Sequence, residues 1–255
     1  MTAEDPLRAR LRSLAAGAPE LADAVAVYRE VLPRVRDAGY RVEPLAVTRD
    51  AAEARLGRGE PLLSEPLPEF DAPAAARLLS DLEAALAARG TAGSAPAGFL
   101  RALSGYSLRP AFRRWGADAM AIFPDGPRWE KGECWVCGDP ALLAELRGPV
   151  QARHLRCGRC AASWGYPRLS CVHCGNEDPA RRAVLLPEGG PGTSRIETCD
   201  DCCGYLKTIV THDPIPADLL SVVDLETVPL DLFIRARGYE RYPRRYAPST
   251  GTRDR

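Results

Sequence analysis

In the first 120 or so residues, apolar positions recur every three or four residues, which is the spacing of amphipathic helices. The strongest pattern runs from Pro19 to Gly39, with proline suited to its first turn, glycine to its end, and a bend expected at Pro33. A second runs from Asp71, a suitable N-cap, to Gly90. Weaker patterns predict helices at 5–15, 48–57, 97–104 and 109–119. We therefore expect a helical, bundle-like domain over residues 1–125.

From about residue 126 the pattern changes to short strand-like runs separated by turns, and the same plan appears twice. In the first copy, residues 126–168, the runs are ALLAEL, VQARHLR and AASWGYPRL. In the second, residues 169–213, they are RRAVLLP, TSRIE and GYLKTIVTH. Two small β modules in tandem are expected. One or two short helices over 214–239, broken near Pro229, should follow, and then a disordered basic tail over 240–255.

Cysteine use separates these modules from the helical part. The chain has nine cysteines, none before residue 134, and eight of them form four identical C-x-x-C units. Chance placement of nine cysteines would produce about 0.3 such units, so the spacing is not accidental. The units are Cys134/Cys137, Cys157/Cys160, Cys171/Cys174 and Cys199/Cys202.

Disulfides and metal ions compete as explanations for these thiols. The opening residues carry no apolar run typical of an export signal, so we expect a reducing compartment, where structural disulfides do not persist. A dithiol oxidoreductase would need one such motif rather than four. Metal binding fits better, because C-x-x-C lets two sulfurs chelate one ion from a single turn, and a second pair completes a tetrahedral site.

The spacing between units favours pairing in chain order. Residues 138–156 separate the first two units and residues 175–198 the last two, close to the usual zinc-ribbon separation. Interleaved pairing, first with third and second with fourth, is the alternative and would need interleaved loops. The predicted metal ligands are Cys134, Cys137, Cys157 and Cys160 for site 1, and Cys171, Cys174, Cys199 and Cys202 for site 2.

Other candidate residues have ordinary explanations. Cys203 follows a predicted ligand and should point away as a passive small residue, with a reactive or spare-ligand role as the alternative. Histidines at 154, 173 and 212 lack partners at metal-ligand spacing, and His173 is expected to be exposed. Tryptophans in the modules should pack over them, with base stacking as the alternative: Trp129, Trp135 and Trp164.

Charge and motif content narrow the functional classes. The formal net charge is +0, and residues 126–215 hold 11 basic and 11 acidic residues. Two divalent ions, each held by four thiolates, would bring that region to about −4, which suits nucleic acid poorly. There is no phosphate-binding loop, dinucleotide motif, nucleophile elbow or apolar run long enough to span a membrane. A closed four-thiolate site also leaves no position for substrate, so a non-enzymatic, protein-binding role is expected, with a zinc-ribbon nucleic-acid binder as the alternative.

The cysteine motifs and their flanks resemble the formate dehydrogenase accessory protein FdhE family. The resemblance rests on CWVCGDP, RHLRCGRCAASW, RLSCVHCGN and above all ETCDDCCGYLK, in which Glu197, Thr198, Asp200, Tyr205 and Lys207 match the family pattern beside the cysteines. The segments RLRSLAAGAPELADAVAVYREV and ADLLSVVDLETVPLDLFIRARGY are similar as well. The likeness extends over roughly residues 5–240.

This resemblance implies a fold of α plus small β class, with an all-helical domain, two tandem rubredoxin-like or zinc-ribbon modules and a short C-terminal helical segment. It implies a cytoplasmic maturation factor, or chaperone, that contacts the catalytic subunit of respiratory formate dehydrogenase before export. The eight paired cysteines would bind two metal ions, iron or zinc, since both ions accept four thiolates. No enzymatic activity, nucleic-acid partner or membrane association is expected, and the resemblance leaves the oligomeric state open.

Overall fold

The computed structural model describes residues 5–89, 97–187 and 193–243. Each helix predicted in the N-terminal part is confirmed, and Pro33 lies inside α2 as expected. Asp71 caps α4 by accepting a hydrogen bond from the Ala74 N–H at 2.9 Å, whereas Gly90, the expected terminator, lies outside the described residues. The helices are α1 (Pro6–Gly17), the single turn η1 (Pro19–Leu21), α2 (Ala22–Asp37), α3 (Arg49–Gly57), α4 (Ala72–Ala87), α5 (Ala97–Ser107) and α6 (Arg109–Ile122).

The strands of both modules lie in one six-stranded sheet, which the sequence did not predict. The order is β3-β2-β1-β6-β5-β4, so each module is a three-stranded antiparallel meander. The first strand of one module pairs in parallel with the last strand of the other, Ala144 opposite Thr208 and Arg147 opposite Thr211. The strands are β1 (Ala141–Arg147), β2 (Ala152–Cys157), β3 (Ser163–Gly165), β4 (Arg182–Leu185), β5 (Ser194–Cys199) and β6 (Gly204–Thr211).

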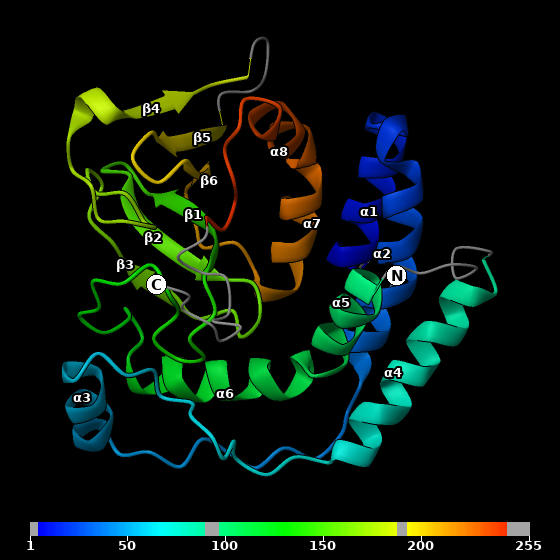
Figure 1. Ribbon diagram of the computed structural model, residues 1–255. Coiled ribbons are helices and arrows are strands. Elements are labelled where there is room, and N and C mark those ends of the chain that lie inside the picture. The colour runs from blue at the N-terminus through cyan, green and yellow to red at the C-terminus, as the bar shows by residue number, and fades with distance from the viewer. Residues whose placement is uncertain (1–4, 90–96, 188–192, 244–255) are drawn as a thin grey trace, which may run out of the picture.

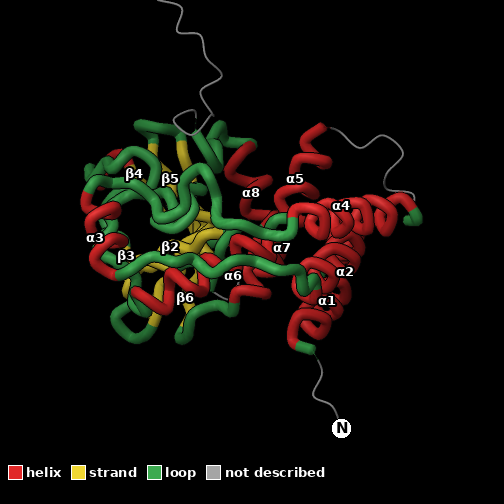
Figure 2. The backbone as a smooth tube through the Cα atoms, turned by 90° about the horizontal axis from the view of Figure 1, so that it is seen from below, coloured by secondary structure: helices red, strands yellow, loops and turns green. Residues whose placement is uncertain are grey.

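Helices pack around this sheet. α6 lies beyond the β3 end of the sheet, and its Phe112 and Trp115 share the principal core with Leu155 and Leu206. One face of the sheet carries α7 (Leu220–Glu226) and α8 (Val228–Arg235), which follow the turn η3 (Ala217–Leu219). The predicted break is confirmed, because Pro229 lies in the first turn of α8. Figures 1 and 2 show the sheet on one side of the molecule and α1, α2 and α4 on the other, with α7 between them.

Two buried ionic groups fix the C-terminal helices to the sheet. Glu145 on β1 is fully buried and accepts hydrogen bonds from the Arg156 guanidinium at 2.6 Å and from the Ile215 N–H at 3.0 Å. Lys207 on β6 lies 2.6 Å from the Asp231 carboxylate and 2.7 Å from that of Asp224. Burial opposes ionisation of Asp224, but Arg241 and Lys207 lower its pKa below the usual value. Such pairs are costly to break, because a remaining charge would be left buried.

Disorder was predicted from residue 240 onward, but residues 240–243 contact the folded part of the protein. The Glu240 N–H donates to the Cys203 carbonyl at 2.8 Å, and the Tyr205 N–H donates to the Glu240 carbonyl at 3.0 Å. Arg241 then forms an ion pair with Asp224. The polar composition that suggested disorder is offset by these bonds to the sheet, while residues 244–255 lie outside the described part. None of the helices in the described residues combines the length and apolar character that a bilayer crossing requires.

Candidate metal centres

The structure brings the eight paired cysteines together in two groups, in the sets that chain-order pairing predicts. Cys134, Cys137, Cys157 and Cys160 form the first cage, and Cys171, Cys174, Cys199 and Cys202 form the second. Within each cage the four sulfurs all lie within 4.8 Å of one another. The interleaved alternative, in which the first C-x-x-C unit pairs with the third and the second with the fourth, does not agree with these two sets.

The sulfur positions fit a tetrahedral ion. With a metal–sulfur bond of about 2.3 Å, the edges of a tetrahedron of sulfurs measure about 3.8 Å. The first cage has Sγ–Sγ distances of 3.5 Å for Cys134–Cys160 and for Cys137–Cys157. The second has 3.8 Å for Cys171–Cys202 and 3.7 Å for Cys174–Cys199. Two ions of the size of zinc or iron could therefore be held, each by four thiolates and with no open position.

Each C-x-x-C unit forms the same tight turn, here called a knuckle. The residue after the second cysteine has a positive φ in all four knuckles: 75° at Gly138, 65° at Ala161, 75° at Gly175 and 52° at Cys203. Only glycine adopts this conformation without steric cost. Cys203 therefore occupies the turn position of the fourth knuckle. Its side chain is exposed and belongs to neither cage, so it points away from the ligands as predicted.

The first cage lies deep in the principal core, under α6. Three of its cysteines are buried, and only Cys137 is partly exposed. Gly116 on α6 lies against the second knuckle, where an added Cβ would be only 2.1 Å from the Cys160 carbonyl oxygen. This approach of helix to knuckle requires glycine, because backbone atoms cannot move aside as a flexible side chain can.

The three tryptophans of the modules are buried around this cage rather than exposed. Their indole N–H groups donate to main-chain carbonyls of the first module: Trp129 to Glu133, Trp135 to Ser163 and Trp164 to Lys131. Their role in packing is confirmed. Rings enclosed in this way offer no face to a nucleic-acid base, which removes the stacking platform that a nucleic-acid binder would use.

Thiol ionisation within the first cage is uneven without a metal ion. Burial opposes the charge on Cys157, but hydrogen bonds from Cys134, Cys137 and Cys160 lower its pKa well below the usual value. Burial raises the pKa of Cys134 and Cys160. A divalent cation that binds this cage would displace the thiol protons, because only thiolates coordinate it.

The second cage is more open to solvent. Cys174 and Cys202 are both partly exposed, and among the described residues no helix packs on its knuckles in the way that α6 packs on the first cage. A short C-terminal segment, residues 239–243, lies against the fourth knuckle instead, with the Tyr239 hydroxyl donating to Asp200 at 2.5 Å. Burial raises the pKa of Cys171 to about 11. The pKa of Cys199 is lowered: burial opposes this, but backbone N–H groups of Cys202 and Asp201 donate to its sulfur.

His173 corrects one expectation, since it is 8% exposed rather than on the surface. Its Nε2 lies 3.0 Å from the Tyr205 carbonyl oxygen, and burial lowers the pKa of His173. The ring packs over Gly204, where an added Cβ would lie 2.5 Å from His173 Cδ2. His154 lies on β2, and His212 is exposed beside Asp213 after β6. None of the three joins a cage.

Asp200 and Asp201 are exposed, but both have partners. The Arg181 Nε donates to Asp201 at 2.8 Å, and Asn176 also bonds that carboxylate. These contacts connect the fourth knuckle to the third and to the start of β4. The sequence analysis did not predict that Gly116, Gly204 and Lys207 support the cages. Gly204 and Lys207 both lie inside the ETCDDCCGYLK motif, but only Lys207 matches the family pattern there.

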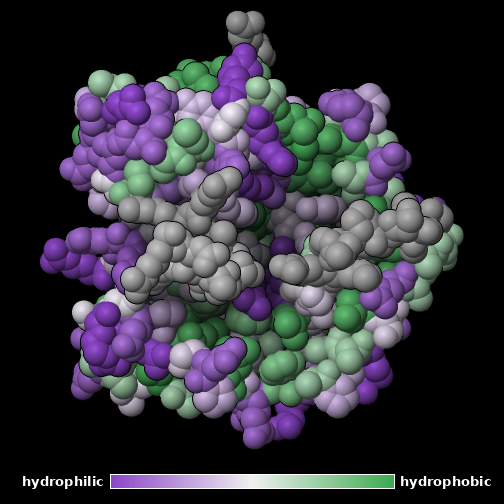
Figure 3. All heavy atoms as spheres, in the orientation of Figure 1, coloured by the Kyte–Doolittle hydropathy of each residue, from purple (hydrophilic) through white to green (hydrophobic). Residues whose placement is uncertain are grey.

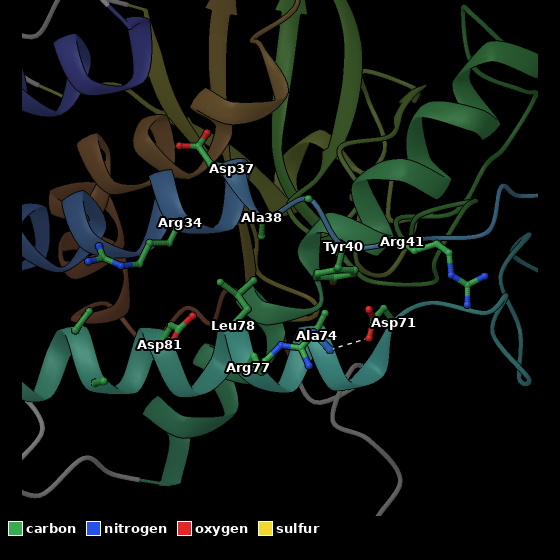
Figure 4. A pocket seen from close by; sticks show the side chains of 13 residues that line it. Arg34, Asp37, Ala38, Tyr40, Arg41, Asp71, Ala74, Arg77, Leu78 and Asp81 are labelled. Atoms are coloured by element: carbon green, nitrogen blue, oxygen red, sulfur yellow. Dashed lines mark hydrogen bonds between the residues drawn. The ribbon is translucent and has the colours of Figure 1, made fainter.

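A groove of about 740 Å³ lies away from both cages, between α2 and α4 (Figure 4). Its charged lining alternates in sign. Arg34 bonds Glu30, Arg41 bonds Glu43, and Asp71 is occupied as the cap of α4. A lining of this kind selects no single charged ligand, so we assign the groove no chemistry.

Known proteins resemble this chain in sequence and in fold, although no family model matches it. A protein FdhE homolog of Stutzerimonas stutzeri is 36% identical over 111 residues, which cover 42% of this chain and 35% of that protein. A protein FdhE homolog of Pseudomonas aeruginosa is 31% identical over 145 residues, which cover 54% of this chain and 46% of that protein. Protein FdhE of Escherichia coli is 29% identical over 137 residues, which cover 51% of this chain and 43% of that protein. The matches thus span less than half the length of these curated relatives.

The fold extends the likeness to nearly the whole chain. The crystal structure of the FdhE protein from Pseudomonas aeruginosa superposes with a TM-score of 0.64 at 24% identity, covering 96% of this chain and 95% of that one. This match shows the shared fold. This chain is therefore similar to FdhE proteins in sequence over about half of its length and in fold over nearly all of it, which is the resemblance that the cysteine motifs predicted.

Proposed function

We propose that this protein is a non-enzymatic accessory factor that binds the catalytic subunit of respiratory formate dehydrogenase and supports its assembly. The partner and the cytoplasmic location come from the family resemblance. The observation that carries the proposal is a pair of closed four-cysteine cages in a fold shared with FdhE. The eight paired cysteines would hold two ions, iron or zinc, and each ion would lack a free position for substrate.

The position of the first cage supports a structural role for its ion. The first cage joins α6 to the sheet, so the ion would hold the helical part and the first module in one unit. Structural ions contribute folding energy directly, with a binding free energy of about 10 kcal/mol or more per site. The second, more open cage has the access that a partner or an exchanging ion requires.

Deletion and complementation test this function. A strain lacking the gene should lose respiratory formate dehydrogenase activity, and the wild-type gene should restore it. The Cys157→Ser gene should not restore activity, whereas Cys203→Ser should, because Cys203 is outside both cages. Affinity purification of the tagged protein from anaerobic cells should retain the enzyme's catalytic subunit. Unchanged formate oxidation in the deletion strain would contradict the proposal. A salt-sensitive gel shift with DNA or RNA would instead favour the nucleic-acid alternative.

A further inference from the structure

The two ends of the sheet differ in how they are protected. At one end β3 is only three residues long, and Ser163 and Trp164 are buried. At the other end β4 forms the outer edge, and no described segment pairs with its free side (Figure 1). An open edge presents unpaired backbone N–H and C=O groups, and it can accept an added strand.

The side chains at the β4 edge are apolar and exposed. Val184 is 55% exposed, and Leu186, just after the strand, is 62% exposed. On the opposite face of the strand, Leu185 packs with Ile234 of α8. α8 also presents Leu232 and Phe233 to solvent, and Figure 3 shows apolar side chains gathered in this upper part of the molecule. The edge therefore has apolar contacts available on both faces of an added strand.

Arginines without an acidic partner lie in and near this edge. Arg182 begins β4, Arg195 lies on the neighbouring β5, and Arg235 ends α8. None of the three forms an ion pair with a carboxylate of the described residues. Three neighbouring acids already have cation partners: Glu197 pairs with Arg153, Asp201 with Arg181 and Asp231 with Lys207. A strand carrying acidic side chains would complement these cations, whereas a basic strand would be repelled.

We propose that the β4 edge binds an extended, acidic segment of a partner protein, which adds to the sheet as a seventh strand. The segment would alternate apolar side chains with carboxylates. Positive charge disfavours the other occupants: a second copy would bring the same arginines together, and the last twelve residues of this chain hold four arginines and one aspartate. Because Arg182 pairs with Cys199, the partner would lie about 10 Å, or two strand spacings, from the strand that ends in the second cage.

A peptide-binding experiment with the full-length, metal-loaded protein tests this surface. The probe is a short fluorescent peptide in which valine alternates with aspartate, compared with one in which valine alternates with lysine. The acidic peptide should bind roughly tenfold more tightly by anisotropy, and it should slow amide hydrogen exchange in residues 182–186. Equal affinity for the two peptides, or slowed exchange only elsewhere, would overturn the proposal.

Two variants with the same charge change provide the control. Val184→Asp should weaken binding of the acidic peptide about tenfold or more. Val150→Asp, at an 80% exposed valine in the turn between β1 and β2, should leave binding unchanged. Equal losses in both variants would contradict a site at β4. Concentration-dependent protection of β4 without peptide would indicate pairing between copies and would overturn the partner proposal.

This inference rests on the proposed function for the identity of the partner, so the two are tested separately. If the wild-type protein captures the formate dehydrogenase catalytic subunit and Val184→Asp captures it equally well, the β4 surface is wrong and the proposed function stands. If the wild type captures nothing while the acidic peptide still protects β4, the surface stands and its assigned partner is wrong.

Discussion

The two cages are built from the same knuckles, yet they lie in different surroundings. The first is covered by a helix, with Gly116 pressed against the Cys160 carbonyl and tryptophan rings around it. The second is held by a short C-terminal segment and by polar contacts of Asp200 and Asp201. Local sequence therefore determines that a cage forms, and the elements packed over it determine how exposed it is. We expect the first to be an integral part of the core and the second to be the accessible one.

Loss of a ligand from the first cage should have the largest effect. Cys157→Ser removes one of the four sulfurs of this cage and should abolish binding of one ion, worth about 10 kcal/mol of folding energy. Because α6 shares the core with this cage, helical circular dichroism should fall along with metal content. Cys199→Ser in the second cage is the matched variant and should leave α6 folded. Equal loss of helicity in both variants would contradict the claim that only the first cage is an integral part of the core.

Removal of the buried lysine should have the next largest effect. Lys207→Met leaves Asp224 and Asp231 without their shared cation, although Arg241 still contacts Asp224. An uncompensated buried charge costs about 3–5 kcal/mol, so the thermal unfolding midpoint should fall sharply. Hydrogen exchange should increase first in α7 and α8. A midpoint within error of the wild type would show that this network does not hold the C-terminal helices.

A methyl group on α6 tests how closely the helix approaches the first cage. Gly116→Ala places a Cβ 2.1 Å from a backbone oxygen and should destabilise the protein by about 1–3 kcal/mol through overpacking. Gly105→Ala on α5 has open space at that position and should be neutral or slightly stabilising, since alanine favours helices. Thermal unfolding compares the two. Equal stability of both variants would contradict tight packing of α6 on the cage.

A chelator should remove the ion from the second cage faster than the ion from the first. Partial exposure of Cys174 and Cys202 gives a chelator access to the second ion, while the first cage offers only Cys137. Stopped-flow removal with a chromogenic chelator should be biphasic, with rates differing by roughly tenfold or more, about 1.4 kcal/mol in activation free energy. In Cys199→Ser the fast phase should disappear. A single phase that releases both ions would contradict the difference in exposure.

The smallest effect is expected at the ninth cysteine. Cys203→Gly relieves a positive φ of 52° in an exposed turn and should stabilise the protein by up to about 1 kcal/mol. Metal content should stay unchanged, because the residue belongs to neither cage. A lower metal content in this variant would give Cys203 the spare-ligand role instead.

Periodicity and cysteine spacing were enough to predict the helices, the strands and the pairing of the knuckles. These features depend on neighbours in the chain, such as Asp71 capping α4 or glycine at the turn position of a knuckle. The parallel pairing of β1 with β6 was not predicted, since no local signal specifies which strands meet across modules. The burial of His173 and the need for glycine at 116 likewise depend on segments that are distant in sequence.

The central claim is that eight cysteines hold two ions in two separate closed cages. Metal analysis with X-ray absorption spectroscopy on anaerobically purified protein tests it most directly. The expected result is two ions per chain, each with four sulfur neighbours at about 2.3 Å. In Cys157→Ser one fully coordinated ion should remain. Metal-free protein with paired disulfides, or ions bound by oxygen or nitrogen in place of sulfur, would contradict the claim.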